Sequence, residues 1–506
     1  MSALPHTAAV GVVGAGTMGA GIAQVAAAAG HPVLLFDLRA DALSAALDRT
    51  RQGLERLVGR GKLSQNAVDA LLGRIRPVER LEDLAPAALV IEAISEELDS
   101  KRRLFEQIEG ICGEHTILAS NTSSLSITAL AATLRHPERL IGMHFFNPAP
   151  VLKLIEVVSG LATAPAVADC IHASAVRWGK QPVRARSTPG FIVNRIARPY
   201  YAEALRVLEA GGADVATIDA ALKEAGGFRM GPFELMDLIG QDINFAVSRS
   251  VFDAYFHDPR YRPSRLQQEL IEAGRLGRKS GRGFYDYHPG SAQPVAREAR
   301  PGPAPTQVSV YGDLGPAEAL VAALAGAEIA VQRTMIGPGF IVVPGATLAL
   351  TDGRSATRRA AEEGIADLVL FDLALDFAKA SRIVIAAADQ APAPAIEAAA
   401  GLFQALGKAV SVIDDSPGLI ILRTVCMLAN AAAAAVGEGV CSAADCDTAM
   451  RGGVNYPLGP LAWADAIGLT RVATALDHLY ECYGDERYRA APLLRRKLYG
   501  GRRFHE

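Results

Sequence analysis

The sequence has little cysteine, little tryptophan and no strong surplus of charge of either sign. Its 506 residues include six cysteines and two tryptophans, and the formal net charge is −3 at pH 7. The cysteines form no CxxC pair, and the two nearest in sequence, Cys441 and Cys446, have no histidine close by. Scattered cysteines of this kind predict structural thiols in a reducing cytoplasm and no metal site. The balanced charge gives no footprint for nucleic-acid binding.

Long uninterrupted apolar runs are also missing. The apolar segment 419–436 is broken by Arg423 and Asn430, so it predicts a buried helix rather than a membrane span. A strand is expected almost at the start of the sequence, which leaves no room for a signal peptide. Half of the residues are nevertheless apolar. At this length roughly three or four domains are expected. We therefore expect a cytoplasmic, multidomain α/β protein that binds neither nucleic acid nor a membrane.

The most informative stretch joins two apolar runs through a glycine-rich turn. Ala9–Val13 predicts a strand, and it is followed by GAGTMG at residues 14–19. An alanine-rich segment, which predicts a helix, then leads to a second apolar run, Val33–Phe36, and to an acid, Asp37. Strand, glycine turn, helix, strand and acid in this order are typical of a dinucleotide-binding unit.

Each part of this unit has a physical role toward a dinucleotide. Gly14 permits the tight turn, Gly16 lets the backbone approach a pyrophosphate, and Gly19 lets the helix pack close to the strand. The free N–H groups and the dipole at the helix N-terminus favour the pyrophosphate anion. Asp37, roughly 20 residues on, is placed to bind a ribose and to repel a 2′-phosphate, which favours NAD over NADP. The alternative is a glycine-rich loop that binds nothing.

Polar residues follow two further predicted strands. The apolar run 88–91 predicts a strand buried on both faces, and Glu92-Ala-Ile-Ser-Glu96 comes at its carboxyl end. Thr116–Ala119 predicts another strand, which leads into the polar run 120–124, Ser-Asn-Thr-Ser-Ser. This run is either only a turn and helix cap or part of a binding site. Because ligands of open parallel sheets bind at the carboxyl ends of the strands, we favour binding.

Residues 38–73 predict a helix with a small cluster of basic side chains. Arg56, Arg60 and Lys62 lie close together in this segment. They are either a solvated helix face or an anion site for a phosphorylated substrate.

The stretch that carries the chemistry is residues 140–160. His144 ends one apolar strand, Asn147 follows it, and Glu156 lies inside a second apolar strand, 152–158. A carboxylate in such a strand is costly unless it is paired, and the nearest partner is His144. Beside a nicotinamide, an imidazole takes the hydroxyl proton of an alcohol while hydride leaves the same carbon, and a carboxylate fixes the tautomer. Taken singly, His144 could be a core histidine whose hydrogen bonds are satisfied, and Glu156 could be an acid at the end of a strand.

From about Ser187 the pattern becomes helical, with helices joined by Gly/Pro turns, and predicts an all-α domain. Asn194 lies near the start of its first helix and is expected to face His144 across a cleft between domains.

Several motifs together resemble the L-3-hydroxyacyl-CoA dehydrogenase family over roughly residues 8–288. They are SNTSS (120–124), HFFNP (144–148), KLIEVV (153–158), TPGFIVNR (188–195) and MGPFELMDLIG (230–240). The resemblance implies an enzyme that uses NAD to oxidise an acyl-CoA substrate. It implies His144 as the catalytic base, Glu156 as its partner, Ser123 as a contact to substrate and cofactor, and Asn194 as a residue that assists at the substrate.

The same resemblance implies a set of NAD contacts around the glycine turn and the strand ends. They are Gly14, Gly16, Met18, Gly19, Asp37, Glu96, Lys101, Ser123, Asn147 and Lys279. The contacts to CoA match less well, because this sequence has Gly53 and Arg60 where a serine and a lysine are expected. Only a basic phosphate contact is then retained.

The second half of the chain repeats the first. Pro189-Gly190 and Pro417-Gly418 lie 228 positions apart, and the same offset aligns the whole first helical segment with residues 416–506. Residues 307–415 resemble a degenerate copy of the dinucleotide-binding domain: VSVYGDLG (308–315) resembles its first strand and turn, and ADLVLFD (366–372) the apolar run 88–91. In this register Val384 takes the place of Glu156 and Leu422 that of Asn194. The second half therefore lacks the catalytic set.

These comparisons predict four domains and a linker. They are a Rossmann NAD-binding domain at 1–186, a helical C-terminal domain at 187–288, a linker at 289–306, a degenerate α/β copy at 307–415 and a second helical domain at 416–506. Helical domains of this family pair with each other, so the tandem copy implies a pseudo-dimer within one chain, with a homodimer also open.

The tandem arrangement, with RTVCMLAN, residues 445–463 and GDERYR (484–489) in its second half, narrows the resemblance to members that act in bacterial phenylacetate degradation. It implies oxidation of 3-hydroxyadipyl-CoA to 3-oxoadipyl-CoA. Arg195 and Arg198 are candidates for the distal carboxylate, although Arg195 has a counterpart, Arg423, in the inactive half. The alternatives are a short-chain 3-hydroxybutyryl-CoA dehydrogenase of fatty-acid β-oxidation, a dehydrogenase of free hydroxy or sugar acids, and a non-catalytic NAD-binding structural protein.

Overall fold

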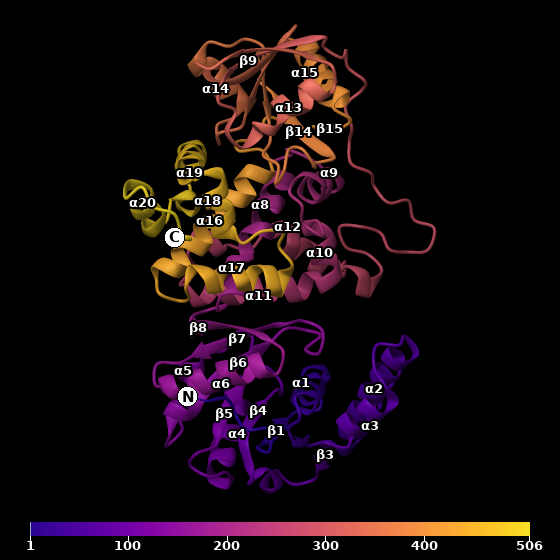
Figure 1. Cartoon of the computed structure of the whole chain (residues 1–506), viewed down its shortest axis with the longest axis vertical. Helices are drawn as coiled ribbons and strands as arrows, with labels where there is room; N and C mark the ends of the chain where they lie inside the picture. Colours follow the sequence, from indigo (N-terminus) through magenta and orange to yellow (C-terminus); the bar gives the residue numbers. More distant parts are fainter. Residues whose placement is uncertain (1) are drawn as a thin grey trace. The chain divides into compact units, whose positions relative to one another are not determined.

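The computed structural model describes residues 2–506, which form two compact units (Figure 1). The first unit runs to Arg195 and also contains Glu438–Val454; the second contains Ile196–Gly437 and Asn455–Glu506. The units therefore do not follow the order of the sequence. A short segment from the middle of the second helical region belongs to the first unit.

The first unit is built on an eight-stranded sheet in the order β3-β2-β1-β4-β5-β6-β7-β8. Neighbouring strands are parallel except β6 and β7, which are antiparallel. The strands are β1 (Ala9–Val13), β2 (Val33–Phe36), β3 (Ile75–Val78), β4 (Ala87–Glu92), β5 (Ile117–Ser120), β6 (Leu140–Phe145), β7 (Leu154–Ser159) and β8 (Gln181–Arg186). This is the doubly wound arrangement that the glycine turn predicts, with strand order reversing between β1 and β4.

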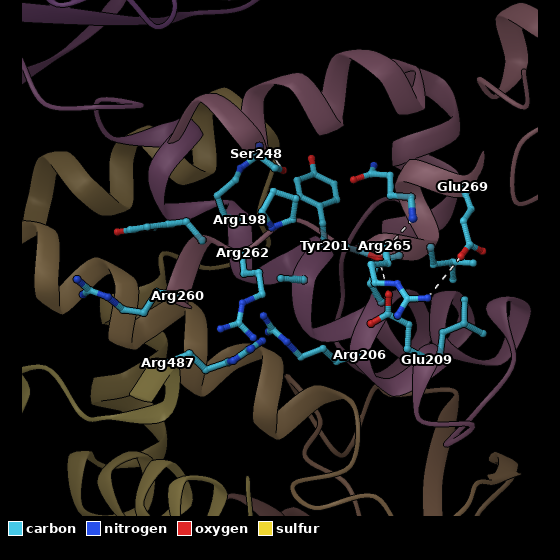
Figure 2. A pocket seen from close by; sticks show the side chains of 18 residues that line it. Arg198, Tyr201, Arg206, Glu209, Ser248, Arg260, Arg262, Arg265, Glu269 and Arg487 are labelled. Carbon is cyan, nitrogen blue, oxygen red and sulfur yellow. Dashed lines mark hydrogen bonds and ion pairs between the residues drawn. The ribbon is translucent and has the colours of Figure 1, made fainter. Parts of the chain in front are cut away.

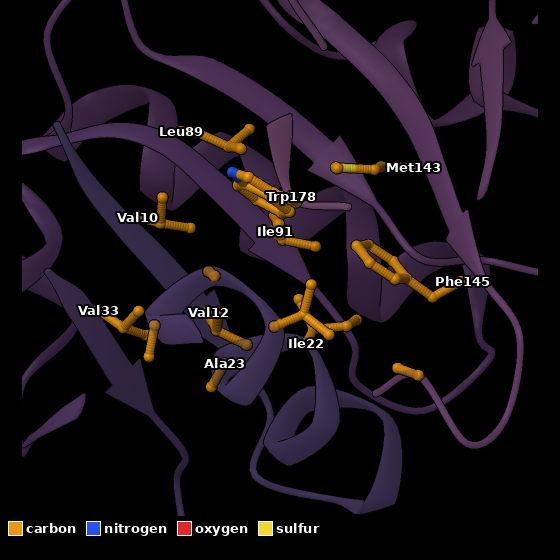
Figure 3. Packing of buried hydrophobic residues seen from close by; sticks show 14 of the residues in the cluster. Val10, Val12, Ile22, Ala23, Val33, Leu89, Ile91, Met143, Phe145 and Trp178 are labelled. Carbon is orange, nitrogen blue, oxygen red and sulfur yellow. The ribbon is translucent and has the colours of Figure 1, made fainter. Parts of the chain in front are cut away.

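One face of this sheet is covered by apolar helices. Val10 and Val12 of β1, Ile91 of β4 and Met143 of β6 pack with Ile22 of α1 in a single core (Figure 3). Because side chains alternate along a strand, Glu92, Ser120, His144 and Glu156 point to the opposite face. The helices of this unit are α1 (Thr17–Ala28), α2 (Ala40–Gly59), α3 (Gln65–Leu72), α4 (Leu98–Ile111), α5 (Ile127–Ala131), α6 (Pro165–Arg177), α7 (Val193–Ile196), which crosses the unit boundary, and α17 (Ala443–Val454).

The helix expected over 38–73 is divided into two in the structure. The segment forms α2 and α3, separated by a turn in which Gly61 has a φ of 67° and Ser64 accepts a hydrogen bond from the N–H of Ala67. A left-handed glycine followed by a serine N-cap ends one helix and begins the next.

The second unit contains a seven-stranded mixed sheet in the order β10-β9-β11-β12-β13-β14-β15, together with the helices of both helical regions other than α7 and α17. The strands are β9 (Gln307–Gly312), β10 (Ala330–Thr334), β11 (Pro338–Val343), β12 (Ala346–Leu350), β13 (Leu368–Phe371), β14 (Arg382–Ala387) and β15 (Ala409–Val412). The helices are α8 (Arg198–Glu209), α9 (Val215–Ala220), α10 (Pro232–Ile239), α11 (Gln241–Ala254), α12 (Arg265–Glu272), α13 (Ala319–Gly326), α14 (Ala356–Glu363), α15 (Ala393–Ala405), α16 (Ile421–Gly437), α18 (Pro460–Ile467), α19 (Leu469–Tyr483) and α20 (Pro492–Tyr499).

The equivalence of residues 366–372 with the run 88–91 is wrong. Strand β13 pairs antiparallel with β14, which pairs parallel with β15, as β6 pairs with β7 and β7 with β8. The segment therefore corresponds to β6, and the offset of 228 places Asp372 at the position of His144. Similar apolar strands have little to distinguish them in sequence, whereas their pairing directions differ.

Helices from the two helical regions pack on each other inside the second unit. Strongly buried α16 lies against α8, and Arg423 Nε makes an ion pair with Glu203 at 3.2 Å between them. Tyr488 donates to the same carboxylate. Among the described residues no helix is long and apolar enough to span a membrane.

Candidate active site

The glycine turn has the shape that a bound pyrophosphate needs. Gly14 has a φ of 103°, and a Cβ there would lie 2.6 Å from the carbonyl oxygen of Ala93. A Cβ on Gly19 would lie 1.7 Å from the oxygen of Gly14, so the helix can approach the strand only through glycine. At Gly16, by contrast, a Cβ would meet no other atom within 4 Å. The open space lies at the N-terminus of α1, where a pyrophosphate would approach the backbone.

Asp37 closes this loop from the end of β2. Its Oδ2 accepts a hydrogen bond from the N–H of Ala15 at 2.7 Å, and its Oδ1 accepts from the N–H of Arg39 at 3.0 Å. The carboxylate therefore lies against the glycine turn itself. A group of this charge favours ribose hydroxyls and disfavours a 2′-phosphate. These residues fit NAD.

A buried lysine joins the ends of β4 and α4. Lys101 Nζ contacts Glu92 Oε1 at 2.5 Å and Glu96 Oε2 at 3.2 Å, and the lysine side chain is only 1% exposed. Glu92 also accepts a hydrogen bond from Ser120 Oγ at 2.6 Å. The two carboxylates compensate the buried ammonium, so this network fixes the strand ends that border the site.

Glu96 organises the polar loop after β5. Its Oε1 lies within hydrogen-bonding distance of Thr122 Oγ1 and of the backbone and hydroxyl donors of Ser123 and Ser124. Burial raises the pKa of Glu96, but the hydrogen bond from Thr122 and the charge of Lys101 outweigh it and leave this pKa below its usual value. One oxygen has more donors than it can satisfy at once. The Ser123 hydroxyl can therefore turn toward a ligand while the loop stays held.

His144 and Glu156 are paired across neighbouring strands. They face each other in the β6–β7 register, and His144 Nδ1 lies 2.6 Å from Glu156 Oε2. Glu156 Oε1 accepts from the N–H groups of Ile192 and Val193, both at 3.0 Å. Since a carboxylate only accepts, Nδ1 must carry the proton and the neutral imidazole presents Nε2 as an acceptor.

Asn194 comes to the same place through the backbone that Glu156 holds. Its Nδ2 donates to the carbonyl oxygen of Ser123 at 3.3 Å. A cavity of about 350 Å³ lies between these groups. Its lining consists of Met18, Ala93, Ile94, Glu96, Lys101, Asn121, Ser123, His144, Phe145, Phe146, Asn147 and Asn194. The structure thus brings the four expected catalytic residues together with Met18, Glu96, Lys101 and Asn147.

Lys279 is not part of this group. It belongs to the second unit, where its Nζ pairs with Asp242 at 2.6 Å, and its expected contact with NAD stays a prediction. Arg56, Arg60 and Lys62 are exposed on and after α2, which leaves both interpretations of that cluster open. Among residues 2–506 no three His, Cys, Asp or Glu side chains are grouped so as to hold a metal ion.

Sequence reasoning placed Glu92 at the end of its strand but missed its pairing with Lys101, and it missed the two backbone donors at 192 and 193. Glu92 ends a strand four residues before Glu96, and an acid at that point was a sign of a second partner for Lys101. Nothing in the sequence indicates the donors at 192 and 193, because almost every residue type supplies a backbone N–H.

Fold and site together define the protein as an NAD-dependent dehydrogenase. The 3-hydroxyacyl-CoA dehydrogenase NAD-binding domain matches residues 9–188, and the C-terminal domain of the same family matches 190–287 and again 418–503. The reduced Rossmann-fold domain of 3-hydroxybutyryl-CoA dehydrogenase matches residues 348–417. The chain belongs to the 3-hydroxyacyl-CoA dehydrogenase family and is an enzyme of that activity.

Two full-length matches, one to a sequence and one to a crystal structure, come from Escherichia coli K12. A 3-hydroxyadipyl-CoA dehydrogenase is 46% identical over 96% of this chain and 97% of its own length. A crystal structure described as 3-hydroxybutyryl-CoA dehydrogenase has a TM-score of 0.87 at 45% identity and covers 97% of this chain and 98% of its own. A probable 3-hydroxybutyryl-CoA dehydrogenase of Bacillus subtilis is 44% identical, over 54% of this chain and 96% of its own length. The half-length relative matches a single copy of the repeat.

Proposed function

We propose that His144, Glu156, Ser123 and Asn194 carry the oxidation of an L-3-hydroxyacyl-CoA to the 3-oxoacyl-CoA. The observation that carries this proposal is the 2.6 Å hydrogen bond from His144 Nδ1 to Glu156, which leaves Nε2 as a proton acceptor at a polar cavity. In the forward direction Nε2 takes the proton of the 3-hydroxyl group, and Glu156 stabilises the imidazolium that forms. In the reverse direction the imidazolium returns this proton.

The other two residues bind and orient the substrate. The Ser123 hydroxyl and the Asn194 amide line the cavity that His144 lines, and both are donors that suit the hydroxyl and thioester oxygens. The chemistry that NAD supplies when bound is acceptance of the hydride from the 3-carbon. We assign its binding to the glycine turn, Asp37, and the further contacts named from the family resemblance, Met18, Glu96, Lys101, Asn147 and Lys279.

For the acyl chain we propose 3-hydroxyadipyl-CoA, which belongs to phenylacetate breakdown. This proposal rests on the full-length relative of that description and on the tandem arrangement that the two chains share. The matched full-length crystal structure is described as a 3-hydroxybutyryl-CoA dehydrogenase instead, so 3-hydroxybutyryl-CoA is the competing candidate. Of the two arginines considered for the distal carboxylate, Arg195 is fully buried and paired with Glu438 at 2.8 Å, which argues for a structural role.

A comparison of substrates tests the acyl chain. NADH formation is expected to proceed with kcat/KM at least about tenfold higher for 3-hydroxyadipyl-CoA than for 3-hydroxybutyryl-CoA, because a site built to bind the distal carboxylate would be left with unpaired polar groups by a substrate that lacks it. Free 3-hydroxy acids serve as the control for the CoA requirement and are expected to give no turnover. Equal or reversed preference would remove the adipyl proposal and leave the family membership standing.

We further propose that the second half acts as a built-in partner that completes the first unit. Helix α17 comes from the second helical region, yet it packs on β7 and β8 of the first sheet. It meets the face that carries Glu156: a Cβ on Gly453 would lie 2.7 Å from Leu154 Cδ2 and 3.1 Å from Val193 Cγ2. Together with the α8–α16 contact, this packing of α17 supports a pseudo-dimer within one chain.

For the location of the protein we propose a reducing cytoplasm, which the six free cysteines support.

The role of α17 can be tested at its paired glycines. Gly453→Val is expected to lower kcat/KM by about tenfold, because overpacking costs about 1–3 kcal/mol and would move Val193, whose N–H holds Glu156. Gly452→Ala is the matched control, since its Cβ would meet Leu154 Cβ at an ordinary 3.5 Å. NADH binding, measured by fluorescence, should stay unchanged in both. Full activity in Gly453→Val would contradict a role for α17 at the site.

A further inference from the structure

A second and larger cavity lies wholly within the second unit. It has a volume of about 740 Å³ and is formed by α8, the turn at residues 259–264 and α12, and its lining also includes Ser248 and Arg487 (Figure 2). Sites for small molecules usually have volumes of about 300–1,000 Å³. None of the residues assigned to catalysis or to NAD lines this cavity; Arg198, one of the two arginines considered for the distal carboxylate of the substrate, does.

Arginine dominates the lining. Six of the eighteen lining residues are arginines, against two glutamates, and no lysine or aspartate is among them. The arginines are Arg198, Arg206, Arg260, Arg262, Arg265 and Arg487. Arginine rather than lysine suits groups such as phosphate, because its planar fork donates two parallel hydrogen bonds.

The two ends of the cavity differ in charge. At one end Arg265 lies near Glu269, at 3.8 Å, and Ser264 donates to Glu209. At the other end Figure 2 shows the guanidinium groups of Arg206, Arg262 and Arg487 directed toward one another. The second end is therefore the one that is suited to an anion.

Positive charge exceeds negative charge at this end. Arg206 and Arg423 both use the carboxylate of Glu203, and Arg487 uses that of Asp485. Arg262 makes no ion pair within residues 2–506, although its charge and that of Arg206 act on Asp485. Arg206, Arg262, Arg423 and Arg487 thus carry four positive charges against the two carboxylates of Glu203 and Asp485.

Arg487 carries buried hydrogen-bond donors at the same end. Its side chain is only 7% exposed, and Nη2 donates to Asp485. Its Nε and Nη1 are buried without a hydrogen-bond partner among the described residues. Buried donors of a charged group are costly when they are unpaired, and an anion within reach of these donors would remove that cost.

We propose that this cavity is a binding site for a diphosphate-bearing small molecule, held by Arg206, Arg262 and Arg487. Two phosphate groups offer enough acceptors for three guanidinium forks and balance the excess charge. The lining also includes the apolar residues Leu205, Pro263 and Leu266, which suit an organic group attached to the diphosphate.

The test is calorimetric titration of pyrophosphate into the full-length protein at constant ionic strength. Saturating NADH blocks the dinucleotide site, so remaining binding reports on other sites. We expect saturable binding that Arg262→Gln weakens at least about tenfold, as loss of a charge-assisted contact predicts. Arg262 is exposed, so this variant should fold and keep its kcat. Arg265→Gln, at the balanced end, is the matched control and should bind within about twofold of the parent.

Two further ligands, ADP and adipate, show which compound supplies the diphosphate and whether the site binds a dicarboxylate instead. If ADP binds at least as tightly as pyrophosphate, the site is assigned to a nucleotide-like ligand. If pyrophosphate binds and ADP does not, the site is assigned to the inorganic ion. Adipate is the dicarboxylate competitor, and saturation by adipate without any by pyrophosphate overturns the proposal. No saturable binding of pyrophosphate or ADP, or equal losses in the two arginine variants, also overturns it.

Discussion

Replacing His144 with alanine is expected to lower kcat at least about a hundredfold, since general acid–base assistance of this kind is worth about 10²–10⁴-fold. In the proposed mechanism the imidazole Nε2 accepts the hydroxyl proton at the cavity, and alanine leaves this proton to water. NADH binding should persist, because the glycine turn and Asp37 lie on other strands and do not depend on His144. Initial rates of NADH formation and fluorescence titration with NADH measure the two quantities.

A histidine elsewhere in the same unit provides the control. His115 is exposed in the turn before β5, and His115→Ala should leave both kcat and NADH binding unchanged. The assignment of His144 as the base would fail if His144→Ala kept more than a tenth of the parent kcat while it bound NADH normally.

The parts of the site that the sequence predicts are those in which local pattern and chemistry coincide. The glycines of this turn have a fixed spacing because the backbone must turn sharply after β1 and α1 must pack close to that strand. The structure shows that side chains at 14 and 19 would clash. His144 and Glu156 stand in apolar strands, where an ionisable side chain needs a partner. Such residues differ visibly from their surroundings, so a single sequence is enough to pair them.

The parts that the sequence does not predict depend on packing between distant segments. Nothing local in residues 438–454 indicates that this segment joins the first unit, because its helical pattern is the same whichever sheet it covers. The mistaken equivalence of residues 366–372 arose in the same way, since a buried apolar strand fits several places in a sheet. Strand direction and pairing, which only the fold fixes, distinguish them.

Glu156 has two separable tasks, one toward the histidine and one toward the backbone. One carboxylate oxygen accepts from His144, and the other accepts from the N–H groups of Ile192 and Val193. The degenerate half keeps only the second task. Asp372, at the position of His144, accepts from the backbone at the start of α16, and burial raises the pKa of Asp372 to about 6.

Glu156→Gln is therefore expected to fold like the parent and to lose about 10²–10⁴-fold in kcat. The amide oxygen can still accept from the backbone donors, but the amide nitrogen now faces His144 and needs an acceptor there. Nδ1 must then give up its proton, and Nε2 carries it. An imidazole in that tautomer presents an N–H to the substrate and cannot take a proton. Retention of more than a tenth of the parent kcat would show that the carboxylate does not set the tautomer.

Glu156→Ala should differ from the glutamine variant by also losing stability, by about 2–5 kcal/mol in urea unfolding. It leaves the N–H groups of Ile192 and Val193 and the proton on His144 Nδ1 buried without an acceptor. Asp372→Ala is the matched control: it removes the acceptor of three backbone donors in the second unit, so it should also destabilise the protein while kcat stays at the parent value. Equal stability of the alanine and glutamine variants at 156 would mean that this carboxylate does not hold the segment that positions Asn194.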